Sequence, residues 1–258
     1  MTVGEALRAL EPLEARLLLA EATGFSAATL IAFPEKALPA DAQQRFTELV
    51  SRRRRGEPVA YLLGRKEFYG IELVVTPAVL VPRPETELLV ERALAQPFAR
   101  ALDLGTGSGA IALALKRYRP RATVVAVESS AAALVVAKRN AARLGLEVDF
   151  RHGRWLDPVD DERFDLIVAN PPYVAEGDPH LGALVFEPRE ALVSGPEGLD
   201  ALREIAERAP AHLSAGGWLF LEHGFDQGEA VRRLLAGLEA VQTWPDLSGI
   251  GRVTGGRR

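Results

Sequence analysis

The chain has 258 residues, of which 48% are hydrophobic and 26% are charged, and its formal net charge is −4. This composition excludes a disordered or fibrous protein, and the length predicts a catalytic domain with a smaller appendage. The negative net charge argues against a protein whose main partner is nucleic acid. The absence of cysteine excludes disulfides and thiolate metal sites, and no two of the four histidines stand at a metal-binding helical spacing, so we expect no metal.

The N-terminal sequence, residues 1–64, is predicted to form a small helical bundle. Met1–Glu5 lacks the basic start and apolar run of a signal peptide, and no apolar run in the chain is long enough to span a membrane. We therefore expect a cytoplasmic protein without a membrane segment. Leucines then recur at near-helical spacing, Gly24 is predicted to end one helix, and Asp41 is predicted to cap the next.

The run Arg52–Arg55 closes the last of these helices and has two interpretations. Cations are favoured at the C-terminal turn of a helix, where they face the negative end of its dipole. Four adjacent arginines can also form a patch for an acidic partner.

Residues 65–84 are predicted to form a β-hairpin linker. β-Formers alternate over 66–75 and return at 79–81, and Thr76-Pro77-Ala78 is predicted to be the turn between the two strands.

From Glu85 to the end, 85–258, helical and strand patterns alternate, which predicts a mainly parallel, doubly wound sheet. The tail predicts two further strands joined by Pro245–Gly249, a hairpin that adds an antiparallel strand at the edge of the sheet. The expected strands are 100–104, 123–127, 164–169, 216–222, 239–244 and 250–255, and the expected helices are 85–95, 109–118, 130–144, 199–213 and 226–236.

A glycine-rich loop follows the first apolar strand and consists of Gly105, Thr106, Gly107, Ser108 and Gly109. Glycines let a ligand approach the backbone closely, although such a loop can also be a tight turn or bind a dinucleotide. The Gly-x-Gly-x-Gly spacing suits the amino-acid part of a nucleoside better than a pyrophosphate. Asp103 can accept a hydrogen bond from a methionine ammonium group or from the loop's own N–H groups.

Glu128 ends the next apolar strand, about twenty residues beyond the loop. A carboxylate at this position can accept hydrogen bonds from both ribose hydroxyls, in S-adenosylmethionine as in NAD. By itself Glu128 can equally be the N-cap of the helix that begins near Ala131. Together with the glycine loop, it favours the ribose role.

The third motif is Asn170-Pro171-Pro172-Tyr173, at the end of the predicted strand 164–169. An amide or exocyclic amino nitrogen is a poor nucleophile, because its lone pair is delocalised. The Asn170 side-chain oxygen and the Pro171 carbonyl can accept its two N–H bonds, and Tyr173 can stack on the planar group. Alone, such a sequence can be only a rigid turn. Downstream of the glycine loop it predicts methyl transfer to a planar nitrogen, driven mainly by positioning.

With these motifs in place, the chain resembles the HemK/PrmC family, the glutamine N5-methyltransferases of peptide chain release factors. The resemblance extends nearly from end to end. It is carried by Arg55–Pro58, Phe68–Gly70, Val81–Glu87, Asp103–Gly109, Asn140, Asn170–Tyr173, Phe186–Pro188, Leu221–Gly224 and Arg252-Val253.

The resemblance implies a class I S-adenosylmethionine-dependent methyltransferase, a Rossmann-like α/β fold with a small N-terminal helical domain that docks the release factor. It implies that S-adenosylmethionine is the cofactor and that the glutamine of the Gly-Gly-Gln motif is the methyl acceptor. A monomer without direct nucleic-acid contact is expected.

Carried onto this sequence, the family's cofactor site comprises Asp103, Gly105–Gly109, Glu128, Trp155 and Asn170, and its substrate site comprises Asn170–Tyr173. Trp155 is implied to pack near the adenine. The family often has an acidic residue where this chain has Arg154, so backbone groups are expected to serve the adenine instead. Glu85 or Thr86, near the family's active site, can also simply start the following helix.

Two other functions share part of this evidence. An adenine-N6 or guanine-N2 methyltransferase of nucleic acid has the same fold, cofactor and tetrapeptide, but it needs a basic, aromatic recognition surface. A non-catalytic nucleotide-binding protein can retain the fold alone.

Overall fold

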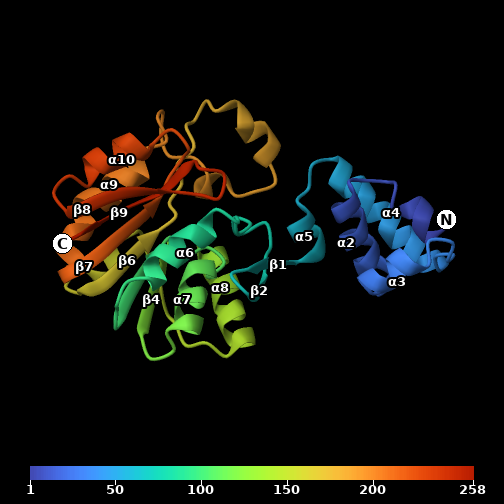
Figure 1. The fold of residues 1–258 in the computed structure, drawn as a ribbon, viewed down its shortest axis with the longest axis horizontal. Helices are drawn as coiled ribbons and strands as arrows, with labels where there is room; N and C mark the ends of the chain where they lie inside the picture. Colours follow the sequence, from blue (N-terminus) through green and yellow to red (C-terminus); the bar gives the residue numbers. More distant parts are fainter. The chain divides into compact units, whose positions relative to one another are not determined.

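The computed structural model describes residues 1–258, which form two compact units, Met1–Arg65 and Lys66–Arg258 (Figure 1). Each unit has its own hydrophobic core. None of the helices combines the length and the hydrophobicity that crossing a membrane requires.

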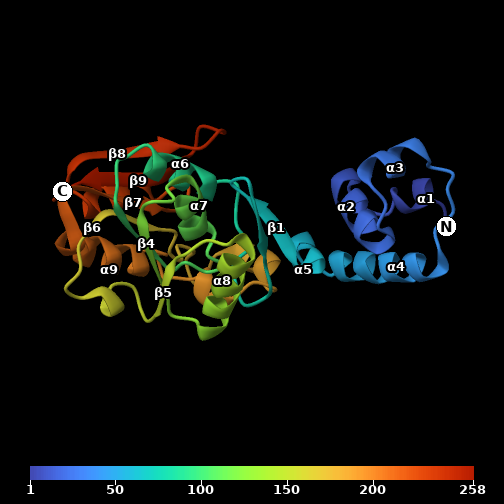
Figure 2. The same ribbon diagram turned by 90° about the horizontal axis from the view of Figure 1, so that it is seen from below.

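The first unit is a bundle of short helices around the buried side chains of Leu18, Leu19 and Phe46. Gly24 adopts a left-handed conformation (φ 71°) directly after the second helix and ends it, as predicted. Figure 2 shows the bundle from below. Its helices are α1 (Val3–Ala6), α2 (Pro12–Thr23), α3 (Ala27–Ala32), α4 (Ala40–Arg54) and α5 (Val59–Leu63).

The prediction that Asp41 caps a helix is wrong. The N-cap of α4 is Pro39, and Asp41 lies within the first turn. There its carboxylate pairs with Arg45 one turn later, at 3.0 Å, and faces the positive end of the helix dipole.

The arginine run at the end of α4 is engaged within this unit. Arg52 makes two hydrogen bonds with Glu57, and Arg53 makes two with Glu14, at 2.8 and 2.9 Å. Arg54 donates to the Ala9 carbonyl. These contacts favour the interpretation in which the run stabilises the end of the helix.

A hairpin of β1 (Arg65–Phe68) and β2 (Ile71–Val74) follows the helical bundle, and all of it except Arg65 belongs to the second unit. Its turn is Tyr69-Gly70, where both residues have positive φ, 48° and 75°, rather than the predicted Thr76–Ala78. Two central residues with positive φ form the turn type whose twist matches that of the strands.

Residues 79–81 form no strand, contrary to prediction, although Val79 and Val81 are buried. The Val81 N–H donates to Glu187 Oε2 at 3.0 Å. The buried Val81 N–H is thus hydrogen-bonded to a side-chain carboxylate instead of to the backbone of a neighbouring strand.

The second unit is built on a seven-stranded sheet in the order β5-β4-β3-β6-β7-β9-β8. Five of the strands run parallel, which confirms the predicted α/β class. Strand β5 was not among the predicted ranges. The strands are β3 (Arg100–Leu104), β4 (Thr123–Glu128), β5 (Asp149–His152), β6 (Phe164–Ala169), β7 (Leu213–Glu222), β8 (Glu239–Pro245) and β9 (Gly251–Arg257).

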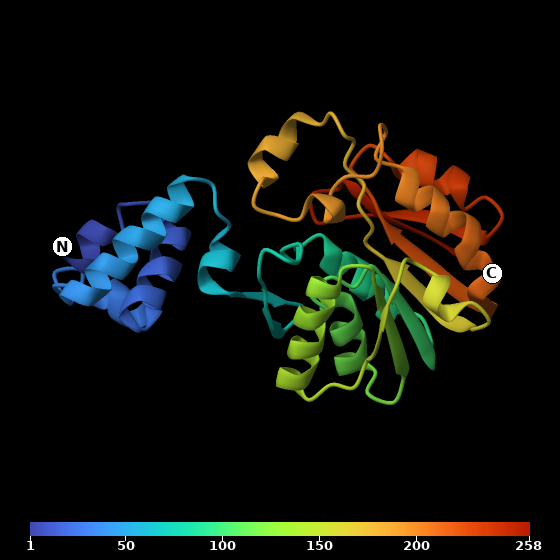
Figure 3. The ribbon, with the colours of Figure 1, turned by 180° about the vertical axis from the view of Figure 1, so that it is seen from behind.

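Strand β9, which runs antiparallel to both of its neighbours, is the second strand from the edge of the sheet. Strand β9 pairs antiparallel with both β7 and β8, so that β8 is the edge strand. Figure 3 shows the terminal strands beside the parallel part of the sheet.

Helices cover both faces of this sheet because successive residues of each strand point to opposite sides. On β3, Ala101 packs with α6, α7 and α8, whereas Leu102 and Leu104 pack with α9 and α10. The helices form where they were expected, and the last turn of the fourth is a 3₁₀ helix, Ala209–His212. They are α6 (Thr86–Leu94), α7 (Ala110–Tyr118), α8 (Ala131–Leu144), α9 (Asp200–Arg208) and α10 (Gly228–Leu234).

Candidate active site

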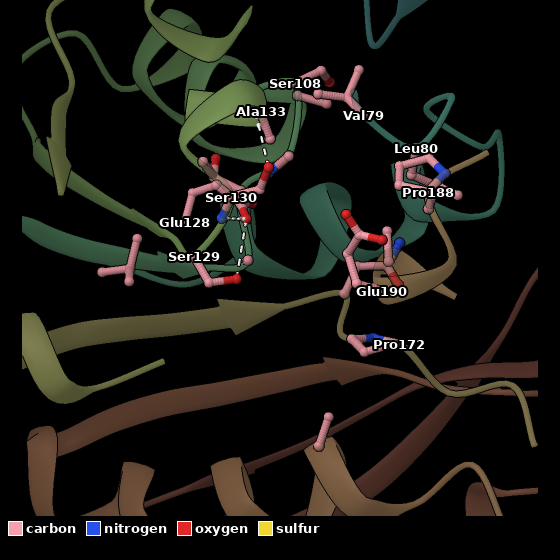
Figure 4. A pocket seen from close by; sticks show the side chains of 18 of the residues that line it. Val79, Leu80, Ser108, Glu128, Ser129, Ser130, Ala133, Pro172, Pro188 and Glu190 are labelled. Carbon is pink, nitrogen blue, oxygen red and sulfur yellow. Dashed lines mark hydrogen bonds between the residues drawn. The ribbon is translucent and has the colours of Figure 1, made fainter. Parts of the chain in front are cut away.

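A cavity of about 440 Å³ lies at the carboxyl ends of β3, β4 and β6. This edge is where open α/β sheets bind ligands. Figure 4 shows Glu128, Ser129 and Ser130 on one side, and Pro172, Pro188 and Glu190 on the other. Of the predicted site residues, the cavity is lined by Gly105, Thr106, Gly107, Ser108, Glu128, Trp155, Asn170 and Pro172.

The glycine loop is held against the end of β4 by its own backbone. The Gly105 and Thr106 N–H groups both donate to the Val127 carbonyl, at 2.9 and 3.0 Å. Gly105 has φ 73°, and a Cβ there would lie 3.1 Å from the Trp155 ring. The loop therefore needs glycine both for its conformation and for its contact with that ring.

Gly109 has a different role, because it does not line the cavity. It precedes α7 with φ 85°, and a Cβ there would lie 3.0 Å from Leu113 and 3.4 Å from Ala137. Its small size allows α7 to pack closely against α8.

Glu128 ends β4 with its carboxylate at the cavity wall. Its two oxygens accept from the N–H groups of Gly107, at 2.8 Å, and Ser130, at 2.9 Å. The alternative role as N-cap is wrong, because Ser130 caps α8 and its hydroxyl accepts from the Ala133 N–H. Glu128 therefore links the glycine loop to the start of α8 and presents an anionic group to the cavity.

Asp103 is fully buried beneath the loop and does not line the cavity. Its Oδ2 accepts from the Thr106 hydroxyl at 2.6 Å and from the Ala112 N–H at 3.1 Å, and its Oδ1 has no partner. Burial raises the pKa of this carboxyl to about 7, although the Thr106 hydroxyl and the Ala112 N–H oppose the shift. Asp103 thus links Thr106 of the glycine loop to Ala112 in the first turn of α7.

Trp155 and Arg154 lie on the same wall of the cavity. Trp155 has φ 43°, which is rare for a bulky residue, and its indole N–H is buried without a partner. The Arg154 guanidinium turns to Glu204 on α9, with Nε at 3.1 Å from the carboxylate. Its charge is therefore paired within the chain.

The tetrapeptide after β6 is divided between the cavity and the interior. Asn170 and Pro172 line the cavity, whereas Pro171 and Tyr173 do not. The Tyr173 hydroxyl donates to Glu222 Oε1 at 3.3 Å. Burial, followed by the nearby Glu222 carboxylate, raises the pKa of Tyr173.

Asn170 is oriented by a residue to which sequence alone gave no definite role. Its side-chain Nδ2 donates to the Thr86 hydroxyl at 3.1 Å, and no group of the chain donates to its Oδ1. Thr86 is the first residue of α6, and Glu85 is the N-cap without a side-chain cap bond. The Thr86 side chain thus belongs to the site.

Glu222 and Glu187 are further buried carboxylates around the cavity that received no role from sequence. Burial raises the pKa of Glu222 to about 7, against the opposing effect of the adjacent Thr86 and Tyr173 hydroxyls. Glu187 accepts from the Val81 N–H and from Arg83. The only sequence signal for either was its place in a segment of the family resemblance.

The cavity has the chemistry that S-adenosylmethionine needs. Glu128 offers carboxylate oxygens suited to a ribose diol. Gly107 leaves open space beside the backbone, and the Trp155 ring provides an apolar surface with one unpaired donor. Asn170 Oδ1 remains as an acceptor in the same cavity.

Comparison with known proteins adds to this description. Residues 4–64 match the family model "PrmC N-terminal domain", and residues 84–197 match "Methyltransferase small domain". The chain is 53% identical to a release factor glutamine methyltransferase of Xylella fastidiosa, covering 96% of this chain and 94% of that protein. It is 50% identical to the protein of the same name from Pseudomonas aeruginosa, covering 95% and 92%.

Among solved structures, a 16S rRNA N2 G1207 methyltransferase of T. thermophilus, in complex with AdoMet and guanosine, is similar with a TM-score of 0.57 at 25% identity. The match covers 75% of this chain and 49% of that one. A methyltransferase from Pyrococcus furiosus has a TM-score of 0.60 at 21% identity, covering 80% and 98%, and supports the fold alone.

Proposed function

The chain belongs to the release factor glutamine methyltransferase family, and from this membership we propose that it methylates the side-chain amide nitrogen (N5) of the glutamine in the Gly-Gly-Gln motif of release factors. The methyl donor is S-adenosylmethionine; its S–CH₃ bond breaks as the N–CH₃ bond forms, the nitrogen then loses a proton, and the products are N5-methylglutamine, S-adenosylhomocysteine and H⁺. The observation that carries the proposal is the presence of Asn170, with its side-chain oxygen unoccupied, in the same cavity as Glu128 and the glycine loop.

S-adenosylmethionine would be held by the glycine loop, Glu128 and Trp155, and when bound it supplies an electrophilic methyl group. The Glu128 carboxylate is suited to the ribose hydroxyls. Asp103 supports this site from beneath, through Thr106.

The chain's own residues position the acceptor amide. Asn170 Oδ1 accepts one N–H bond of the glutamine, and the backbone carbonyl of Pro171, which stands between the cavity-lining residues Asn170 and Pro172, accepts the other. The two bonds direct the nitrogen's lone pair toward the donor. As positive charge develops on this nitrogen, both oxygens stabilise it. Tyr173 supports the segment through Glu222 rather than from the cavity wall.

The protein substrate also needs a surface on which to dock, and we assign this role to the N-terminal helical unit. The match to the PrmC N-terminal domain supports the assignment. So do Leu13 and Leu17, which lie one turn apart on α2 and are 62% and 41% exposed. The names of the relatives support release factors as the partners, and we propose the cytoplasm, where translation takes place, as the location of the enzyme.

The test is a labelled-methyl assay with a release factor, a variant of it whose motif glutamine is replaced, and DNA and RNA as alternative acceptors. We expect one methyl group, located by mass spectrometry on the motif glutamine, and no labelling of the variant. In the Asn170→Ala enzyme, kcat should fall about a hundredfold or more, with cofactor affinity largely retained. Methylation of nucleic acid but not of the release factor would refute the proposal.

A further inference from the structure

The tetrapeptide Asn170–Tyr173 offers few backbone groups by which the rest of the chain can hold it. Pro171 and Pro172 have no N–H to donate, and the proposed function needs the Pro171 carbonyl for the acceptor amide. Proline restricts φ but leaves ψ free, so the position of that carbonyl depends on what holds the chain on either side of the two prolines. On the amino-terminal side, the Asn170 side chain is bonded to Thr86.

On the carboxyl-terminal side, the peptide group that joins Tyr173 to Val174 is hydrogen-bonded at both of its polar atoms. The Val174 N–H donates to the Leu192 carbonyl at 2.8 Å. The Tyr173 carbonyl accepts from Gln227 Nε2 at 3.0 Å. The Gln227 side chain thus helps to fix the plane of the peptide group that directly follows the two prolines and the tyrosine.

Gln227 is itself fixed at both ends of its side-chain amide. It is the N-cap residue of α10, and its Oε1 accepts from the Gly224 N–H at 2.8 Å. Its Nε2 donates to Tyr173 and also lies 3.3 Å from the carbonyl oxygens of Glu197 and Gly198. With an N–H donor at one end and three carbonyls at the other, the amide can adopt only this orientation.

Gly198 shows how closely the chain approaches this hydrogen bond. It has φ 71°, and a Cβ there would lie 2.2 Å from the Tyr173 carbonyl oxygen and 2.9 Å from Gln227 Nε2. Any other residue would push the carbonyl or the amide away, so the bond between Gln227 and Tyr173 requires glycine at this position.

We propose that Gln227 is a positioning residue for methyl transfer, which holds the Tyr173 carbonyl and thereby keeps the Pro171 carbonyl and Asn170 at the spacing that the acceptor amide requires. This inference rests on the proposed function, because it takes those two oxygens as the acceptors of the glutamine N–H bonds. Gln227 does not line the cavity, so it acts through the tetrapeptide and touches no reacting atom.

The variant Gln227→Glu tests the donor and leaves the shape of the side chain unchanged. The carboxylate keeps an oxygen for the Gly224 N–H, but when ionised it has no proton for the Tyr173 carbonyl. When protonated, it regains one donor. Gln227→Ala removes both contacts and does not titrate. The ratio of the two variants cancels any pH dependence that they share.

In the full-length enzyme with a release factor and S-adenosylmethionine, we expect both variants to lower kcat about tenfold at about pH 8.5, with cofactor Kd within about twofold of the wild type. As the pH is lowered to about 6, kcat of Gln227→Glu should rise about threefold or more relative to that of Gln227→Ala, because the protonated side chain again donates to Tyr173.

Asp165→Ala is the matched control, because it removes a side chain that bonds to backbone groups at the opposite end of β6. Asp165 Oδ2 accepts from the N–H groups of Ala99 and Arg100, at 2.9 and 3.0 Å. We expect this variant to lose stability and to keep the kcat of the wild type. If kcat is unchanged in folded Gln227→Ala and Gln227→Glu, or if the ratio of their kcat values does not change with pH, the proposed role of Gln227 is refuted.

Amide hydrogen exchange of the cofactor-bound enzyme gives a second readout, which needs no protein substrate. The Val174 N–H, and the Ser194 N–H that donates to the Val174 carbonyl at 3.0 Å, should exchange about tenfold faster in Gln227→Ala than in the wild type. Both should exchange at the wild-type rate in Asp165→Ala. If the wild-type enzyme does not methylate the release factor, the proposed function fails, whereas unchanged exchange in Gln227→Ala separately refutes the role of Gln227.

Discussion

We expect the buried carboxyl of Asp103 to make the stability of this protein depend on pH. Burial raises its pKa from 3.8 to about 7, so the folded state binds this proton more tightly than the unfolded state does. Its contribution to stability is fully present below the unfolded pKa and is lost as the pH rises through about 7.

We therefore expect the cofactor-free wild type to lose more stability than Asp103→Asn between about pH 4 and about pH 8, by on the order of 4 kcal/mol. The amide variant keeps an acceptor for Thr106 and Ala112 but does not ionise. Urea unfolding across this pH range measures the difference. Parallel pH profiles for the two proteins would show that Asp103 does not titrate in this way.

Glu222 leads to a prediction about rate. Its pKa is raised to about 7, first by burial and further by the nearby Glu85, whereas Thr86, Tyr173 and Arg252 lower it. Above this pH the ionised carboxylate accepts a charge-assisted hydrogen bond from the Tyr173 hydroxyl, and below it the neutral acid holds Tyr173 less strongly.

With both substrates saturating, kcat should fall as the pH drops through about 7, because protonated Glu222 anchors Tyr173 and the substrate-binding tetrapeptide less firmly. Glu222→Gln should be slow and lack this acid limb, and Asp103→Asn should keep it. Measuring kcat against pH for the wild type, Glu222→Gln and Asp103→Asn tests this assignment of the acid limb to Glu222. An acid limb that persists in Glu222→Gln would assign the titration to another group.

Among the structural elements, α8 connects the hairpin to the glycine loop through one buried side chain. Asn140 accepts from the Val74 N–H at 2.7 Å and donates to the carbonyls of Val74 and Ser108, both at 2.9 Å. A single amide thus holds β2 and the loop in a fixed relation.

Asn140→Ala should lower the free energy of unfolding by roughly 2–4 kcal/mol, because it leaves buried backbone groups unpaired. It should also weaken cofactor binding, since Ser108 belongs to the loop. Gln227→Ala is the comparison. Its amide bonds to Gly224 and Tyr173, away from the glycine loop, so cofactor Kd should not change. Urea unfolding and equilibrium dialysis separate the two effects, and equal cofactor affinities in both variants would contradict this role.

The elements that sequence predicted well were those with a strong local pattern. The parallel strands and their helices follow from apolar runs and 3.6-residue periodicity, and Gly24 was recognisable as a helix end. The hairpin turn was misplaced because Thr76-Pro77-Ala78 carries a familiar turn signal. The actual turn requires positive φ at Tyr69, which local propensity disfavours.

For the candidate site, sequence indicated the residues that follow the strands but not those that meet behind them. Glu128 and Asn170 were predicted because the carboxyl ends of parallel strands converge at one edge. The contact of Thr86 with Asn170 joins residues 84 positions apart, and that of Tyr173 with Glu222 joins residues 49 apart. No local pattern encodes either contact, since both arise only when α6 and β7 flank β6.

At the scale of the whole molecule, the two units should contribute separately to catalysis. All of the residues that line the cavity belong to Lys66–Arg258. If Met1–Arg65 serves to dock the protein substrate, changes on its surface should alter the recognition of a release factor without altering the chemical step.

The double variant Leu13→Gln and Leu17→Gln tests this division in the full-length chain. Glutamine maintains helix propensity and removes the apolar surface of α2. We expect KM for the release factor to rise about tenfold, equivalent to about 1.4 kcal/mol of lost binding, with kcat and cofactor Kd unchanged.

Val135→Gln is the control, because Val135 is equally apolar, 67% exposed, and lies on α8 in the other unit. A short Gly-Gly-Gln peptide, which lacks the rest of the release factor, should be methylated equally by all of these enzymes. If the double variant and the control bind the release factor equally well, α2 is not part of the docking surface.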